Sequence, residues 1–315
     1  MMIGPSLETA SVTLASLLPV LEFNTRVALL GAGSLGAAAG FVGTFLVLRR
    51  RALIADTLGH STLPGVCIAF LLMTLFLGSA RNLPLLLAGG TLSAGLAAWA
   101  VSAVARLPKI REDAALAIVL GAFFGLGIAL LGVLQQLETG QVAGLDALID
   151  GNVASLRAGD AEMIAWLSLG AVLVTILLFK ELALLAFDAE QARLQGLPIR
   201  FLEFVQLVLT VVVTVAGLRA VGLILIIALL VIPPAAARFW SNRLPVVAAL
   251  SALIGGLSGL MGAWISAQRA GLPTGPLIVL TASAVFALSL IFGTTRRRRR
   301  VERVPGVDGS EVVSG

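Results

Sequence analysis

The residues with the clearest capacity for chemistry are Asp56 and His60, the second being the only histidine of the chain. They stand four positions apart in an otherwise apolar stretch, so on a helix they share one face about a turn from each other. A carboxylate and an imidazole together suit a borderline divalent cation such as Mn²⁺, Fe²⁺ or Zn²⁺. Two ligands cannot enclose a metal ion, so a second subunit or water must complete such a site. The alternative is an Asp–His hydrogen bond that only fixes packing.

Pro64 and Gly65 follow this pair directly. A proline in a helix removes the hydrogen bond to the carbonyl four residues back, here that of His60. The freed carbonyl is either a further oxygen ligand or a hinge, so both positions are candidates for gating. The pair Pro233-Pro234 is expected to break its helix in the same way, as a kink that shapes packing or as a moving hinge.

The elements that must position these residues are membrane-spanning helices. Of the 315 residues, 58% are hydrophobic and 12% charged, against about 45–50% and about 25% in soluble proteins. Several apolar stretches approach the ~20 residues needed to cross ~30 Å of hydrocarbon. The composition therefore excludes a soluble fold and predicts an all-α, polytopic transmembrane helical bundle in a lipid bilayer.

Nine spans are predicted from the apolar runs between charges and turn residues. They lie near residues 26–48, 55–78, 84–105, 114–134, 162–179, 201–217, 220–237, 245–267 and 275–293. Only Gly217 to Ala220 separate the sixth span from the seventh, so eight spans with one re-entrant or broken segment is the alternative. The spacings Gly36/Gly40, Gly121/Gly125 and Gly255/Gly259 fit close helix packing.

The distribution of basic residues predicts the orientation of the bundle in the membrane. With nine spans, 17 of the 22 basic residues fall on one side and five on the other. The basic side holds Arg49 to Arg51, Arg106, Lys109, Arg111, Lys180, Arg193, Arg200, Arg238, Arg243, Arg296 to Arg300 and Arg303. This split places the N-terminus outside and the C-terminus in the cytoplasm. Because the net charge of +5 sits in these short loops and in the tail, no nucleic acid is expected as a partner.

Three parts of the chain follow from this layout. Residues 1–24 form an outer N-terminal segment with an interfacial helix, and residues 25–293 form the transmembrane domain. Residues 294–315 form a basic, disordered cytoplasmic tail, whose arginines anchor the last helix against anionic lipid.

Enzymatic activity is not expected of this chain. Its only lysines, Lys109 and Lys180, do not follow the glycine of a phosphate-binding loop, so ATP cannot be bound in that manner. The single histidine stands beside Asp56 in a span rather than near an exposed nucleophile.

The stretch from Phe45 to Gly65 resembles the signature of the metal-ion ABC transporter permeases, the membrane subunits of manganese, zinc and iron importers. The resemblance extends over about residues 30–293. It includes Glu112-Asp113, Phe187 to Ala192 with Gly196, Ala220 to Pro233, and Pro273-Thr274-Gly275. The chain departs from the pattern at Gly59, where many relatives carry Ser, and at Pro234, which doubles the usual single proline.

The resemblance implies a permease of a prokaryotic plasma (inner) membrane that imports a divalent metal. Asp56 and His60 would bind the metal in the translocation path. A coupling helix near 187–196 would dock on a cytoplasmic ABC ATPase dimer, through Phe187, Asp188, Glu190, Ala192 and Gly196. Two identical or sister permeases would surround the path.

The acidic outer loop, about 135–161, would receive the ion from an extracytoplasmic metal-binding protein. Mn²⁺ is favoured over Zn²⁺ and Fe²⁺, because the segment Gly144 to Leu148 looks more like the manganese and iron branch. Two other classes stay open: an ATP-independent secondary transporter or channel that uses the same Asp/His pair, and a regulatory or scaffolding membrane subunit.

Overall fold

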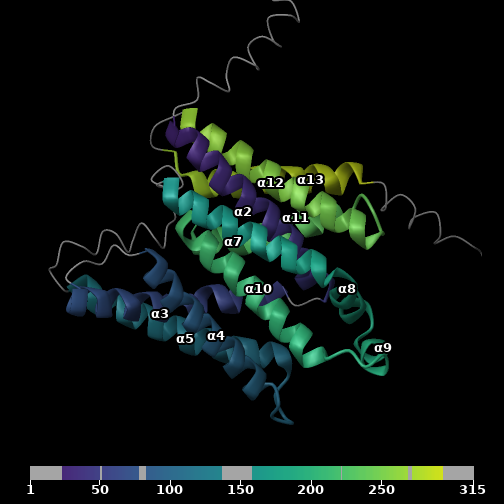
Figure 1. Ribbon diagram of the computed structural model, residues 1–315, viewed down its shortest axis with the longest axis horizontal. Helices are drawn as coiled ribbons and strands as arrows, with labels where there is room; N and C mark the ends of the chain where they lie inside the picture. Colours follow the sequence, from purple (N-terminus) through teal and green to yellow (C-terminus); the bar gives the residue numbers. More distant parts are fainter. Residues whose placement is uncertain are drawn as a thin grey trace, which may run out of the picture.

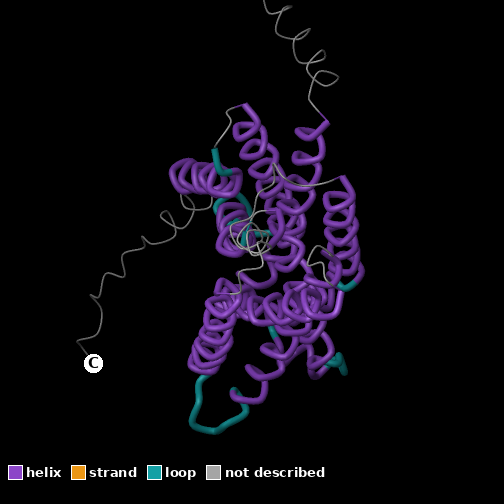
Figure 2. The backbone as a smooth tube through the Cα atoms, turned by 90° about the vertical axis from the view of Figure 1, so that its left-hand side faces the viewer, coloured by secondary structure: helices purple, strands orange, loops and turns teal. Residues whose placement is uncertain are grey.

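The computed structural model describes residues 23–49, 52–77, 83–136, 158–220, 222–268 and 272–293, and within these residues every regular element is an α-helix (Figures 1 and 2). The expected interfacial helix at 1–24, the outer loop and the basic tail lie largely or wholly outside this part of the chain. The helices are α2 (Phe23–Leu48), α3 (Ala52–Leu77), α4 (Leu83–Val104), α5 (Glu112–Gln136), α7 (Ala158–Leu177), α8 (Phe179–Phe187), α9 (Ala189–Leu194), α10 (Ile199–Ala220), α11 (Leu223–Ala237), α12 (Leu244–Gln268) and α13 (Thr274–Phe292).

Eight of the described helices are long and apolar enough to cross a membrane. The exception among the nine predicted spans is α11, which has 15 residues and is therefore only about 22 Å long at 1.5 Å per residue. Gly222, with a φ of 88°, separates it from α10. A backbone in this region favours glycine, so the chain turns sharply there. The described residues thus include eight helices long enough to cross a membrane and one shorter apolar helix at the place of the seventh predicted span.

The closest helix pairing joins α2 and α12 in antiparallel fashion. A Cβ added at Gly36 would strike the backbone of Gly255, and one at Gly40 would strike that of Ser251. The hydroxyl of Ser251 donates a hydrogen bond of 2.6 Å to the carbonyl oxygen of Gly40. The expected close packing is therefore confirmed at two of the three glycine pairs. Around Gly121 and Gly125 an added Cβ would meet no described atom within 4 Å.

Replacing Gly36 with leucine is expected to destabilise the bundle by about 3 kcal/mol, because the clash is with backbone and no side chain can rotate away from it. The melting temperature of the detergent-purified protein measures the effect. Gly170→Leu on α7 is the matched control, since an added Cβ there meets nothing within 4 Å and leucine favours the helix. Equal melting temperatures for the two variants would contradict the packing described for α2 and α12.

One end of the bundle, here called the basic end, collects the ends of α2, α4, α11 and α13 and the starts of α3, α5, α10 and α12. The pairing of α12 with α13 is antiparallel, since Thr281 bonds Ser258 and Ser266 lies 2.8 Å from Thr274. In Figure 1 the basic end lies to the right, together with α8 and α9. The described basic residues here are Arg49, Arg106, Lys109, Arg111, Lys180, Arg193, Arg200, Arg238 and Arg243. The start of α2 and the end of α13 therefore lie at opposite ends of the bundle.

The helices pack as two groups. Helices α3, α4 and α5 contact one another, and α2, α7, α11, α12 and α13 form the larger group. Figure 1 shows α10 running between the two groups, and it contacts helices of both. Helix α10 is thus placed to transmit movement between them.

Candidate functional site

Asp56 and His60 lie on one face of α3, as their spacing predicts. The Nε2 atom of His60 is 3.4 Å from Oδ1 of Asp56, and the side chains are 21% and 38% exposed respectively. This separation is longer than the ~2.7–3.2 Å of an ordinary N–H···O hydrogen bond. A pair that only fixed packing inside the bundle would be buried and tightly bonded. These two side chains are instead partly accessible and loosely paired.

Phe124 of α5 completes the immediate surroundings of His60. Its ring meets the imidazole edge to face, with 4.7 Å between ring centroids. The Nδ1 atom of His60 is buried and has no hydrogen-bond partner among the described residues. The aromatic contact therefore limits how far the imidazole can swing. The sequence could not reveal this contact, because Phe124 lies in a separate span and looks like any lipid-facing aromatic residue.

Pro64 and Gly65 lie where α3 meets its two neighbours. Helix α3 continues through Pro64 without interruption. A Cβ added at Gly127 of α5 would lie 2.9 Å from Cβ of Leu63 and 3.1 Å from Cδ of Pro64, and Gly65 faces Gly89 of α4 across a backbone contact. Both positions allow close packing in the α3–α4–α5 group. Their role in gating stays a prediction.

Pro233 and Pro234 are buried within α11, which continues as a helix through both to Ala237. The prolines therefore do not end the helix, and the kink expected at them stays a prediction. The carbonyl oxygen left without an intrahelical donor by Pro234 is that of Leu230, and Gly43 of α2 lies directly against it. The absence of a side chain at Gly43 lets α2 pack against α11 at this turn. Movement at this site as a hinge stays a prediction.

One chain supplies two of the donors that a first-row transition metal needs. No group of three or more His, Cys, Asp or Glu side chains lies close enough to hold a metal ion within the described ranges. A tetrahedral site takes four ligands, so this pair must be supplemented. A second copy of the pair, water or the freed carbonyl of His60 are the available sources.

The second candidate element is the pair of short helices α8 and α9 at the basic end. The side chain of Asp188 caps α9 by accepting hydrogen bonds from the backbone N–H groups of Glu190 and Gln191, at 3.0 and 2.9 Å. Gly196, with a φ of 77°, ends the helix, and Leu197 N–H bonds the carbonyl oxygen of Ala192 at 3.1 Å. These contacts form a Schellman motif, so α9 has a fixed shape despite its length.

The exposed surface of α8 and α9 differs from what the resemblance implies in one respect. Ala192 is fully buried, so its contribution is to seat α9 on the bundle. Phe187 and Leu194 are 67% and 85% exposed, and they are large apolar residues at the charged end of the protein. Leu194 was not among the residues expected to contact an ATPase. Nothing in the sequence marks Leu194, because tertiary packing decides which face of so short a helix is exposed.

Comparison with known proteins identifies the family. The sequence profile of the ABC 3 transport family matches residues 22–293. The chain belongs to the ABC 3 transport family. It is 41% identical over 273 residues to the manganese transport system membrane protein MntC of Bacillus subtilis, a match that covers 87% of this chain and 62% of that protein. It is 39% identical over 287 residues to the zinc transport system membrane protein TroC of Treponema pallidum, which covers 89% of this chain and 95% of that protein.

The fold of this ABC 3 chain is also similar to that of a solved structure, PsaBC from Streptococcus pneumoniae in complex with Fab. The TM-score is 0.78 with 27% sequence identity, and the match covers 92% of this chain and 99% of that one. The all-α transmembrane fold expected of an ABC permease is therefore confirmed. As a permease subunit of the ABC 3 family, the chain is not itself the catalytic component.

The cap of α9 in this ABC 3 permease gives a prediction that needs no partner. Asp188→Ala should weaken α9 by about 1 kcal/mol and speed amide hydrogen exchange at Glu190 and Gln191 about fivefold. Asp188→Asn keeps a capping oxygen and should exchange like the wild type. Hydrogen exchange with mass spectrometry makes the comparison. Unchanged exchange in Asp188→Ala would show that another contact holds the start of α9.

Proposed function

We propose that this chain is the permease subunit of an ABC importer that moves a divalent transition metal into the cytoplasm. Mn²⁺ is favoured, followed by Zn²⁺ and Fe²⁺. The observation that carries the proposal is the loosely joined, partly exposed Asp56–His60 pair within a span, at 3.4 Å. An ionisable pair inside a membrane-spanning helix is costly and marks ion pathways. The relatives named for manganese and zinc transport support the same substrate class.

The chemistry of the pair fits a transported ion better than a permanently bound one. A carboxylate and an imidazole bind Mn²⁺, Fe²⁺ and Zn²⁺, and two ligands from one chain hold an ion weakly. Conduction requires binding that is favourable enough to admit the ion and weak enough to release it. Two permeases around one path would bring two copies of the pair together, and the site would come apart when the subunits separate at that level.

The basic end is proposed to face the cytoplasm, because cytoplasmic loops carry the excess of Lys and Arg. The start of α2 then lies outside and the end of α13 inside, in a prokaryotic plasma membrane. Helices α8 and α9 would dock on a cytoplasmic ATPase dimer, through the exposed Phe187, Glu190 and Leu194. Asp188 and Gly196 would hold α9 in shape.

The same proposal assigns roles to the acidic outer loop, the transmembrane domain and the basic tail, and names the partners of the chain. An extracytoplasmic metal-binding protein would deliver the ion at the acidic loop, of which residues 137–157 lie outside the described part. The transmembrane domain, 25–293, would carry the path, and the tail 294–315 would bind anionic lipid. Since the lysines of this chain do not form a phosphate-binding loop, the energy must come from separate ATPase subunits.

The metal content of cells grown in metal-poor medium tests the proposal. A strain that lacks this chain is compared with one that is restored by the wild type, and Mn, Fe and Zn are measured by mass spectrometry. The restored strain should accumulate one of these metals, with Mn expected, and that result names the substrate. Identical content of all three metals in the two strains would contradict metal import by this chain.

A further inference from the structure

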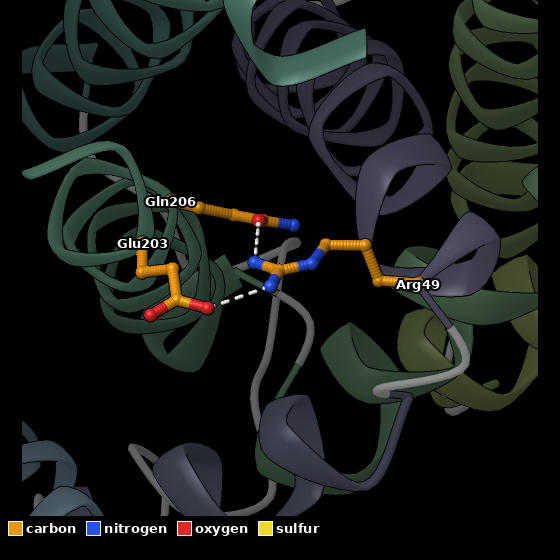
Figure 3. A network of polar contacts seen from close by, with 3 residues as sticks. All are labelled: Arg49, Glu203 and Gln206. Atoms are coloured by element: carbon orange, nitrogen blue, oxygen red, sulfur yellow. Dashed lines mark hydrogen bonds and ion pairs between the residues drawn. The ribbon is translucent and has the colours of Figure 1, made fainter. Parts of the chain in front are cut away.

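The basic end contains an ion pair that joins α2 to α10 (Figure 3). The Nη2 atom of Arg49 lies 2.7 Å from Oε1 of Glu203. Its Nη1 atom donates a hydrogen bond of 3.1 Å to Oε1 of Gln206, one turn further along α10. The planar guanidinium thus contacts two side chains of the same helix at once, which a lysine could not do in this geometry.

The two charges of this pair differ in their access to water. The side chain of Arg49 is 9% exposed, whereas that of Glu203 is 34% exposed. A buried charge that loses its partner is destabilised strongly, so Arg49 favours the paired arrangement. Because the carboxylate of Glu203 is partly hydrated already, it can regain water when the helices separate. The pair is therefore strong enough to hold one arrangement of α2 and α10 and can still open.

The ion pair lies beside the corner from which the Asp56–His60 pair extends. Arg49 follows the last residue of α2, and α3 begins at Ala52. Asp56 is the fifth residue of α3, about 6 Å along the helix axis from Ala52. Because α3 follows Arg49 after only two residues, we infer that the contact of Arg49 with α10 bears on where α3 starts, and so on the Asp56 and His60 side chains.

Helix α8 contacts both helices that the ion pair joins, and α9 contacts one of them, α10. Phe179, the first residue of α8, packs edge to face against Phe45 of α2 at 5.4 Å between centroids, and its ring is 6.3 Å from that of Phe41. Both α8 and α9 also contact α10. A movement of these short helices therefore acts on the end of α2 and the start of α10, the two elements that Arg49 joins.

We propose that Arg49 is a positioning residue that transmits movement of α8 and α9 to the Asp56–His60 pair through its contacts with Glu203 and Gln206. The inference rests on the proposed function, since it presumes that α8 and α9 meet an ATPase. With the ion pair closed, α3 is held in one position relative to α10. With the ion pair open, the start of α3 moves. The Asp56–His60 pair then changes its distance from the same pair in the second permease.

The test uses the whole transporter, with permease and ATPase reconstituted together in lipid vesicles and the extracytoplasmic metal-binding protein supplied with the ion. ATP hydrolysis and Mn²⁺ uptake are measured on the same vesicles for the wild type and Arg49→Met. The expected result for the variant is continued ATP hydrolysis with about tenfold less Mn²⁺ imported per ATP, in the range of ordinary coupling between sites. A loss of stability alone would lower both rates in proportion and leave their ratio unchanged.

Two further variants sharpen the result. The reversed pair, Arg49→Glu with Glu203→Arg, should recover a large part of the lost ratio. Arg200→Met removes an exposed arginine from the start of the same α10 and should keep the wild-type ratio.

An unchanged ratio in Arg49→Met overturns the inference, as does a fall in both rates together with loss of the assembled complex. Wild-type vesicles that take up no Mn²⁺, Fe²⁺ or Zn²⁺ with ATP would overturn the proposed function itself, and the wild-type arm alone reveals that failure.

Discussion

Replacing His60 with alanine is expected to abolish metal uptake while the permease still reaches the membrane. The chain offers two donors for the ion, so the variant keeps a single carboxylate at each copy of the site. Residues that only hydrogen-bond a metal ligand, without touching the metal, already contribute about 10–100-fold to metal affinity. Loss of a direct ligand should therefore lower uptake by at least about 100-fold. Alanine favours a helix more than histidine does, so α3 itself is not weakened. Uptake of radioactive Mn²⁺ by intact cells, corrected for permease abundance, measures the effect.

Thr74→Val is the matched control for His60→Ala. Thr74 lies on the same helix and its hydroxyl bonds only the carbonyl oxygen of Phe70, one turn back, at 2.9 Å among the described contacts. This variant should take up metal like the wild type, and Asp56→Ala should behave like His60→Ala. Wild-type uptake by His60→Ala would show that the Asp56–His60 pair fixes packing and does not bind the transported ion.

Replacing Leu194 with glutamate is expected to separate the permease from its ATPase. Leu194 is 85% exposed at the end of α9, and an exposed leucine on a capped helix is suited to insertion into an apolar pocket. Burying a charge there should cost about 2 kcal/mol or more, the size of a hot-spot loss, and so weaken association about 30-fold. Co-purification of the ATPase with tagged permease measures the association, and ATP-driven uptake should fall with it.

Leu107→Glu provides the control for this substitution. Leu107 is an exposed leucine in the connection between α4 and α5, at the same basic end. This substitution changes charge and hydropathy as much as Leu194→Glu does. Because it lies away from α8 and α9, the ATPase should still co-purify. If the two variants retained the ATPase equally, α9 would not be the docking element.

The sequence predicted the spans well because each is bounded by charges and is long enough to cross hydrocarbon. The observed ends of α2, α4, α12 and α13 differ from the predicted ones by at most a few residues. The prediction was less complete at α11, where the positive φ of Gly222 shortens the helix. Apolar composition alone does not distinguish 15 residues of helix from a full span. The gathering of basic residues at one end follows directly from the charge pattern.

The details of the site could be predicted only as far as they are local. Asp56 and His60 share a face because they are four residues apart on one helix, and this needed no tertiary information. The Phe124 ring beside His60 and the Glu203 carboxylate beside Arg49 come from distant segments, and nothing in either segment marks the partner. Pro234 shows the opposite case, since its local effect is to interrupt a helix, whereas α11 continues through it.

ATP-dependent uptake of Mn²⁺ by vesicles that contain the purified permease and its ATPase, with the metal-binding protein added on the extracytoplasmic side, tests ATP-driven metal import most directly. The extracytoplasmic face of the transporter points out of these vesicles and the cytoplasmic face points into the lumen. Mn²⁺ is added outside, ATP is enclosed in the lumen, and the Mn²⁺ that enters the lumen is measured. The account predicts that Mn²⁺ moves toward the cytoplasmic face only when ATP is hydrolysed, and that His60→Ala stops it. Equal Mn²⁺ movement with and without ATP would contradict the account and indicate a secondary transporter or channel.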